Sequence, residues 1–218
     1  APDSHDYINP LDVDLTTNTG ENPLLMKADF IMSFCELILS AAQGGLKPIE
    51  KSVIDRCIPK IYRQLIKDPR PENMPILGDL YEILAASPET KRLANILNRL
   101  VNGSARSFNQ QTNVALDNKY IVLDISELTG DLLTVGMFVA LDFVWDKAKE
   151  NRTAEKAIFV DECWQLIGAS SNRQAAESVL ELAKTIRGYG GSLVCATQDL
   201  NDFFALDDGK YGKGIINN

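Results

Sequence analysis

The sequence predicts an α/β protein in which helices flank a parallel sheet, with an all-helical segment before the sheet. From residue 24 to residue 105 apolar residues recur at helical spacing and no run resembles a strand. After residue 118 short apolar runs alternate with longer helical patterns, the order typical of a parallel sheet. The expected organisation is a connecting segment (1–23), a helical subdomain (24–112) and an incomplete α/β core (113–218).

Apolar stripes predict four helices in the first half, over residues 26–42, 48–65, 76–86 and 88–101. Pro48 suits a first helical turn, where a missing N–H leaves no hydrogen bond unmade. Pro59 lies inside the second helix, and an interior proline costs about 3 kcal/mol. We therefore expect a kink or break near Arg56.

The second half is expected to alternate strands and helices. Strands are predicted over 119–125, 156–160, 192–197 and 215–216, and helices over 132–149, 171–187 and 199–206, with a polar turn over 207–214. Ser171 and Gln174 form a capping box at the start of one helix, and Gly188 is expected to end it.

Charge and residue usage restrict the function. The net charge of -8 argues against a surface built mainly to grip nucleic acid, although a local basic patch stays open. His5 is the one histidine and lies in a polar terminus, which disfavours histidine-based triads and metal sites.

Four separated cysteines predict buried free thiols and a reducing compartment, because no two form a CxxC pair. They are Cys35, Cys57, Cys163 and Cys195. The polar start and the lack of a long apolar run make the cytoplasm the expected location. Since Ala1 is not a methionine, we expect a processed product or a fragment.

Two adjacent carboxylates, Asp161 and Glu162, follow the apolar strand that ends at Val160. A Walker B strand has this form, with one acid for Mg²⁺ and one to polarise the attacking water. Buried strands also end in acids that cap the next helix, so both interpretations are open. The partner motif GxxxxGK[ST] is absent: Gly209-Lys210 and Gly212-Lys213 lack its other residues.

The next strand strengthens the functional interpretation, because it ends in Thr197-Gln198-Asp199. Parallel strands present their carboxyl ends along one crevice, so we expect Gln198 beside Glu162. An amide there can donate to a phosphate oxygen and accept from the attacking water. The alternative is an ordinary polar strand end.

Arg187 begins a glycine-rich turn before that strand. A positive charge at a helix C-terminus is favourable by itself, and the same charge could reach a phosphate in its own subunit or across an interface. Spacing does not decide between these. Trp164 is interpreted as a packing anchor rather than a base-stacking platform.

Taken together, these stretches resemble the large ATPases of conjugative type IV secretion systems, of the VirB/TraC type. The matching stretches are the INPLD sequence ending at Asp12, residues 50–55, Gly103-Ser104 with Phe108-Asn109, YIVLDIS at 120–126, VDECW at 160–164, the Arg187 turn, ATQDL at 196–200 and the terminal GIINN. They cover nearly the whole chain.

The resemblance implies a partial RecA-like P-loop motor domain with an inserted helical subdomain, using ATP and Mg²⁺. In it Asp161 would coordinate Mg²⁺ and Glu162 would act as general base. Gln198 resembles a phosphate-sensing glutamine and Arg187 the arginine of the family turn, with Thr197 also at the nucleotide. The family implies hexamers or dimers on the cytoplasmic face of the membrane, with inner-membrane channel proteins as partners.

The chain departs from the family in three places. Gly188 follows Arg187 where lysine is frequent, Cys163 stands where alanine is usual, and the phosphate loop is missing. We therefore expect little ATP affinity and negligible turnover for the chain alone. The phosphate-loop strand usually adjoins the Gln198 strand, so an unpaired edge or apolar slot is expected there, filled by another copy of the chain.

Two other functions compete with this interpretation. A DNA translocase of the HerA/FtsK type shares the same engine, but the acidic charge does not support direct nucleic-acid binding. In a non-catalytic interaction module, the helical half would dock partners and the strand-end acids would be structural.

Overall fold

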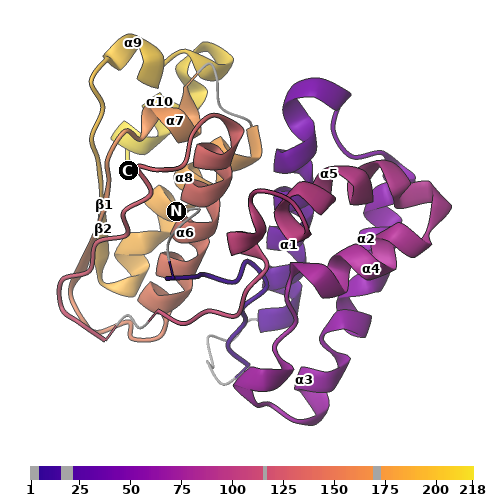
Figure 1. Cartoon of the computed structure of the whole chain (residues 1–218). Helices are drawn as coiled ribbons and strands as arrows, with labels where there is room; N and C mark the ends of the chain where they lie inside the picture. Colours follow the sequence, from indigo (N-terminus) through magenta and orange to yellow (C-terminus); the bar gives the residue numbers. More distant parts are fainter. Residues whose placement is uncertain (1–4, 16–21, 115–116, 169–172) are drawn as a thin grey trace. The chain divides into compact units, whose positions relative to one another are not determined.

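The computed structural model describes residues 5–15, 22–114, 117–168 and 173–218. The chain divides into two compact units, Ala1–Val135 and Gly136–Asn218. Figure 1 labels the helices and strands of both units.

The first unit is helical, as the sequence predicts. Its helices are α1 (Pro23–Gln43), α2 (Pro48–Ile61), α3 (Arg63–Lys67), α4 (Leu77–Ala86) and α5 (Lys91–Val101), with 3₁₀ turns η1 (Pro71–Asn73), η2 (Pro88–Thr90) and η3 (Arg106–Phe108). Leu93, Leu97 and Leu100 recur at helical spacing on α5 and are buried. This stripe packs α5 against α4.

The predicted break near Arg56 is absent, because α2 continues through Pro59 to Ile61. Pro59 lies in the last turn, so only the two residues after it remain in the helix. Because Pro59 has no N–H, the helix lacks only the one bond that residue 59 would donate to the Asp55 carbonyl. The helix thus ends two residues after Pro59 and not before it.

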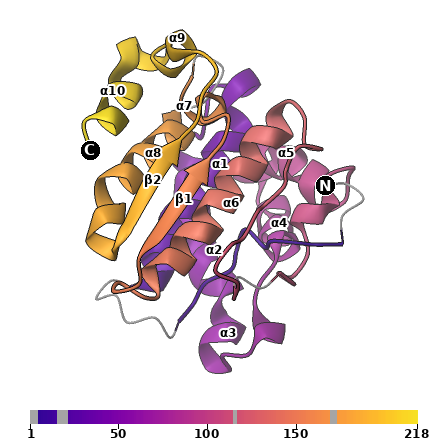
Figure 2. The same cartoon turned by 90° about the vertical axis from the view of Figure 1, so that its left-hand side faces the viewer.

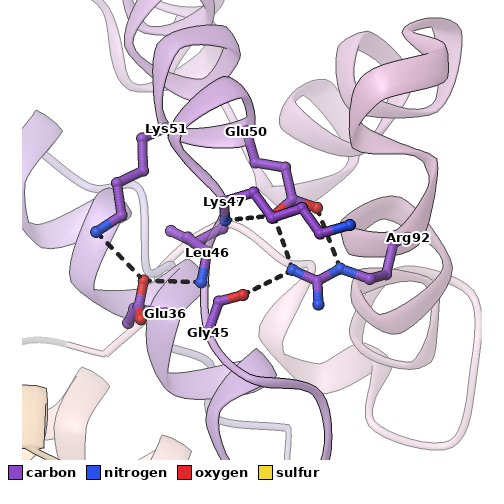
Figure 3. Close-up of polar contacts among 7 residues, drawn as sticks. All are labelled: Glu36, Gly45, Leu46, Lys47, Glu50, Lys51 and Arg92. Carbon is purple, nitrogen blue, oxygen red and sulfur yellow. Dashed lines mark hydrogen bonds and ion pairs between the residues drawn. The ribbon is translucent and has the colours of Figure 1, made fainter.

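A buried ion pair links the turn between α1 and α2 to α5 (Figure 3). The Glu50 side chain is 1% exposed and accepts hydrogen bonds from the Lys47 backbone N–H and from Arg92, both at 2.7 Å. Arg92 also donates to the Gly45 carbonyl at 2.6 Å. Burial by itself would raise the pKa of Glu50, but the bonds from Arg92 and Lys47 outweigh it and lower that pKa.

The second unit holds a parallel sheet flanked by helices, so the predicted fold class is confirmed. Its elements are α6 (Asp131–Lys149, which begins in the first unit), β1 (Lys156–Val160), α7 (Trp164–Ile167), α8 (Arg173–Thr185), η4 (Ile186–Tyr189), β2 (Gly191–Cys195), α9 (Leu200–Phe203), η5 (Leu206–Gly209) and α10 (Lys210–Ile216). Ser171, the predicted cap of α8, lies outside the described residues. No helix in the described ranges is long and apolar enough to cross a bilayer.

The two strands pair in register from Lys156↔Gly191 to Val160↔Cys195. Helices α6 and α8 lie on one face of this sheet, and the opposite face is turned toward the viewer in Figure 2. On that open face Phe159 is 74% exposed and Val194 41%. Among the described residues β2 pairs with β1 alone, so the edge predicted to be unpaired beside the Gln198 strand is open.

Residues 119–125, predicted as a strand, form none in the structure. The Asp124 side chain accepts from the Ser126 N–H at 2.9 Å, and Leu128 N–H donates to the Ile125 carbonyl at 3.0 Å, so the chain turns there. Tyr120 is exposed. A high β-propensity does not make a strand when no neighbouring strand supplies ladder hydrogen bonds.

The predicted final strand, residues 215–216, is also wrong, because these residues end helix α10. The polar turn predicted over 207–214 is present only at its start, where Asp207, Asp208 and Gly209 have positive φ, because α10 begins at Lys210. A Cβ on Gly212 would lie 2.5 Å from the Phe203 carbonyl, and one on Gly214 would lie 2.6 Å from Leu180. Glycine therefore allows α10 to pack tightly in this unit.

Candidate functional site

The carboxyl ends of β1 and β2 bring an acid and an amide together. Pairing continues past the strands, since Ala196 N–H donates to the Val160 carbonyl and Cys163 N–H to the Ala196 carbonyl, each at 2.9 Å. Just beyond, the Gln198 side-chain amide donates to Glu162 Oε1. The expected neighbours, Glu162 and Gln198, are therefore in direct contact.

Glu162 is held in an unusual backbone conformation. Its φ is 50°, in the left-handed region that non-glycine residues seldom adopt. Its N–H donates to Asp161 Oδ1 at 2.9 Å, and its second carboxylate oxygen accepts from the Trp164 indole N–H. Strain of this kind costs about 1–3 kcal/mol and is concentrated at functional sites. Both oxygens of Glu162 are thus fixed in place.

Asp161 is exposed beside Glu162 at the end of β1. The described residues contain no group of three His, Cys, Asp or Glu side chains that could hold a metal ion. Mg²⁺ does not need such a cage, because proteins commonly bind it through one or two carboxylates together with substrate phosphates. The carboxylate chemistry of Asp161 fits that mode.

The residues around Gln198 are ordered by local hydrogen bonds. Thr197 Oγ1 donates to the Asp199 carbonyl at 3.0 Å. The Asp199 side chain accepts from the Asn201 N–H at 2.7 Å and so caps α9. Asp199 thus has a structural role, which keeps the turn bearing Thr197 and Gln198 in one conformation.

Arg187 lies elsewhere. It is exposed in η4, at the amino end of β2, whereas Glu162 and Gln198 lie beyond the carboxyl ends. The five residues of β2 span about 16 Å at roughly 3.3 Å each. The structure therefore does not bring Arg187 to the other predicted site residues.

The turn that carries Arg187 is fixed through Tyr189. The Tyr189 ring meets Trp145 edge-on at 5.0 Å, and Arg152 lies 4.4 Å from its centroid. Lys156 donates to the Tyr189 carbonyl at 2.9 Å, and burial lowers the pKa of Lys156. A Cβ on Gly190, whose φ is +72°, would lie 2.8 Å from the Arg152 carbonyl. Arg187 is thus carried on a turn that Tyr189 and Gly190 pack against the preceding loop.

Sequence reasoning missed the indole contact to Glu162, since Trp164 was interpreted as packing. The signal was its position two residues after the acid, where the chain turns into α7. A side chain in that first turn can fold back onto the preceding residues. Trp164 therefore belongs to the candidate site.

The sequence analysis also did not predict that two of the cysteines lie close together. Cys35, Cys57 and Cys163 are buried as predicted, but Cys195 is only half-buried. The Cys163 and Cys195 thiols are near enough to interact. The interaction with Cys195, followed by burial, raises the pKa of Cys163, whereas the interaction with Cys163 lowers the pKa of Cys195. The two residues are far apart in sequence, and they lie close together because β1 and β2 are paired.

Comparison with known proteins gives a family and a structural relative. The family model of the TraG P-loop domain matches residues 89–218. The solved structure of VirB4 of Thermoanaerobacter pseudethanolicus is similar, with a TM-score of 0.81 and 26% sequence identity. That likeness covers 96% of this chain and 58% of the VirB4 chain. No curated protein matches the sequence.

Both findings agree with the motif resemblance. The family model covers more than half of the chain, including both strands and every residue of the candidate site. The structural likeness extends through the helical unit as well. The chain belongs to the TraG P-loop domain family, and its fold is that of a P-loop NTPase fragment of the VirB4 type.

Proposed function

We propose that this chain is part of an ATPase motor that drives type IV secretion or conjugative DNA transfer. The observation that carries the proposal is the hydrogen bond between Gln198 and Glu162 across the carboxyl ends of two adjacent parallel strands. Family membership and the likeness to VirB4 support the same class of motor.

In this proposal Glu162 is the general base. Its two oxygens accept from Gln198 and Trp164, and each keeps lone-pair capacity for the proton of an attacking water. The fixed backbone means that little reorganisation is needed when the water is polarised. The Gln198 carbonyl oxygen can accept from the same water, and Thr197 would help to hold the nucleotide.

Asp161 is the proposed Mg²⁺ ligand. The bound ion with ATP would supply charge neutralisation of the phosphates. This chain contributes the exposed Asp161 carboxylate. It stays next to Glu162 because its Oδ1 accepts a hydrogen bond from the Glu162 backbone N–H. Walker B is therefore the proposed identity of the strand that ends at Val160.

Arg187 is proposed to act on the nucleotide of a neighbouring copy. Its place at the amino end of β2 supports an action across an interface rather than on its own Glu162. The full-length protein would then be a homo-oligomer, a hexamer or a dimer. Its further partners would be inner-membrane channel proteins, at the cytoplasmic face of the membrane.

The sequence contains no GxxxxGK[ST] motif to cradle phosphates. We therefore propose that this chain alone has little ATP affinity and that the full-length protein supplies the cradle. We also propose that residues 24–112 are the inserted helical subdomain and that residues 113–218 belong to the motor core. Residues 1–23 are then a connecting segment.

The decisive experiment is Glu162→Gln in the full-length protein. A lost general base should lower kcat for ATP hydrolysis by about 10²–10⁴-fold while ATP binding is retained. Glu155→Gln is the matched control, because Glu155 is an exposed acid at the opposite end of β1. Its turnover should equal that of the wild type.

Steady-state hydrolysis and equilibrium binding of a fluorescent ATP analogue are the two measurements. If Glu162→Gln hydrolyses ATP as fast as the wild type, the catalytic role of this acid is wrong. A non-catalytic docking module would then be the better assignment.

A further inference from the structure

Cys163 and Cys195 lie together at the carboxyl ends of the two strands. Cys195 is the last residue of β2 and pairs with Val160, the last residue of β1. Cys163 N–H donates to the carbonyl of Ala196, the residue after Cys195, at 2.9 Å. The backbone thus holds both cysteines in neighbouring positions, near enough for their thiols to interact.

The two thiols differ in access to solvent. Cys163 is 0% exposed, whereas Cys195 is half-buried. A reagent from solution can therefore reach Cys195 first, with Cys163 next to it on the buried side. Dithiol sites that react with small disulfides have this arrangement, one accessible attacking sulfur and one neighbouring resolving sulfur.

We propose that Cys163 and Cys195 form a thiol modification site, which a low-molecular-weight disulfide such as oxidised glutathione converts into an intramolecular disulfide. This inference does not depend on the proposed ATPase function. It requires only the two strand ends as the structure places them.

The reaction has two exchange steps. Cys195 gives up its proton and attacks one sulfur of oxidised glutathione, the glutathione S–S bond breaks, and the glutathione thiolate that leaves is protonated to the thiol. The Cys163 sulfur then attacks Cys195, the mixed disulfide breaks, and the departing second glutathione takes up the Cys163 proton. Two protein thiols are oxidised by two electrons, and one glutathione disulfide is reduced to two thiols.

The product would join the residue directly after Glu162 to the strand that leads to Gln198. Because Cys163 follows Glu162 in sequence, the new bond would restrict the turn in which both Glu162 and Trp164 lie. The modification therefore reaches the candidate site without touching its polar groups. Reduction by a dithiol reagent would reverse it.

Cys35 and Cys57 provide an internal control. Both lie in the helical unit and are at most 1% exposed, so a solution disulfide has no entry to either. They are near enough to interact electrostatically. Proximity alone would therefore allow that pair to react, whereas proximity with access favours Cys163 and Cys195.

The experiment treats the folded chain with oxidised glutathione, quenches with acid, unfolds it and alkylates the remaining thiols. The intact mass should show two alkylated thiols of the four and no retained glutathione. A peptide digest without reductant should contain the Cys163–Cys195 crosslink. Circular dichroism before quenching confirms that the chain stayed folded.

Three variants assign the two sulfurs. Cys163→Ser should stop at a stable glutathione adduct on Cys195, and Cys195→Ser should remain unmodified. Cys57→Ser should form the crosslink as the wild type does. The wild-type digest remains decisive if a variant fails to fold.

Four free thiols in the treated wild type would overturn the proposal. So would a lasting glutathione adduct on wild-type Cys195, which would mean that the buried sulfur cannot approach. A Cys35–Cys57 crosslink in place of the expected one, or modification of Cys163 in Cys195→Ser, would overturn it equally.

Discussion

The helical unit and the sheet unit differ in how completely they cover their apolar surface. In the helical unit the α5 leucines are buried against helices of the same unit. In the sheet unit, helices cover one face of β1 and β2, while Phe159 and Val194 remain exposed on the other. A helix can bury its apolar face against the next helices along the chain. A parallel sheet has two apolar faces, and each needs its own covering layer.

The two units also differ in the surroundings of one acidic side chain each. Glu50 is enclosed and fully paired with Arg92, an arrangement that ties the α1–α2 turn to α5. Glu162 is only half-buried, and its backbone is strained. Glu50 contributes to stability, whereas Glu162 lies in the candidate site. Three substitutions test this comparison of the two units, from the largest expected effect to the smallest.

The largest effect is expected from Arg92→Met. It leaves Glu50 as an enclosed carboxylate without its partner, which costs about 3–5 kcal/mol of unfolding free energy. Urea unfolding followed by far-ultraviolet circular dichroism measures the loss.

Arg99→Met is the matched control on the same helix. The Arg99 side chain is 52% exposed, and its partner Asp131 is 84% exposed. Such a surface pair contributes less than about 1 kcal/mol. Equal losses for both variants would show that Glu50 is not enclosed in solution.

A smaller effect is expected from Leu97→Ala. Leu97 is fully buried on α5, so the substitution removes apolar contacts and leaves a cavity. The expected cost is about 3 kcal/mol, measured by the same urea titration. A cost below about 1 kcal/mol would indicate that the helical core is loosely packed, contrary to the comparison.

The smallest effect is expected from Phe159→Ser on the open face of the sheet. With 74% of Phe159 exposed, the unfolding free energy should change by less than about 0.5 kcal/mol. Ile158→Ala is the control on the same strand, because Ile158 is buried and should cost about 2 kcal/mol. The measurement is thermal and urea unfolding of this chain.

The same Phe159→Ser variant sharpens the comparison in the full-length protein. If another layer covers that face there, the substitution should cost clearly more than it does in this chain. Equal costs would show that the face stays exposed to solvent in both.

Much of the secondary structure could be predicted from the sequence, because local periodicity controls it. The α5 stripe and the α6 run needed no knowledge of distant residues. The wrong predictions concern segments whose structure depends on contacts with residues far away in the sequence. Residues 119–125 have strand composition but no neighbouring strand, and the glycines before Ile215 were read as a turn although they pack against Phe203 and Leu180.

The candidate site was predictable in part. That Gln198 would meet Glu162 followed from the rule that parallel strands share one carboxyl edge. The Trp164 bond and the Cys163–Cys195 contact did not follow, since they depend on how the chain turns after each strand. The same rule puts Arg187, which precedes β2, at the opposite edge of the sheet from Glu162.

The sequence by itself determined the class of the chain: helices first, then a parallel sheet with an acid pair and a glutamine at its strand ends. It could do so because apolar period and strand-end chemistry are local properties. Only the tertiary structure decided which sheet face stays open, which acid is enclosed and which thiols meet. Those outcomes depend on contacts between residues far apart in the chain, which no local pattern specifies.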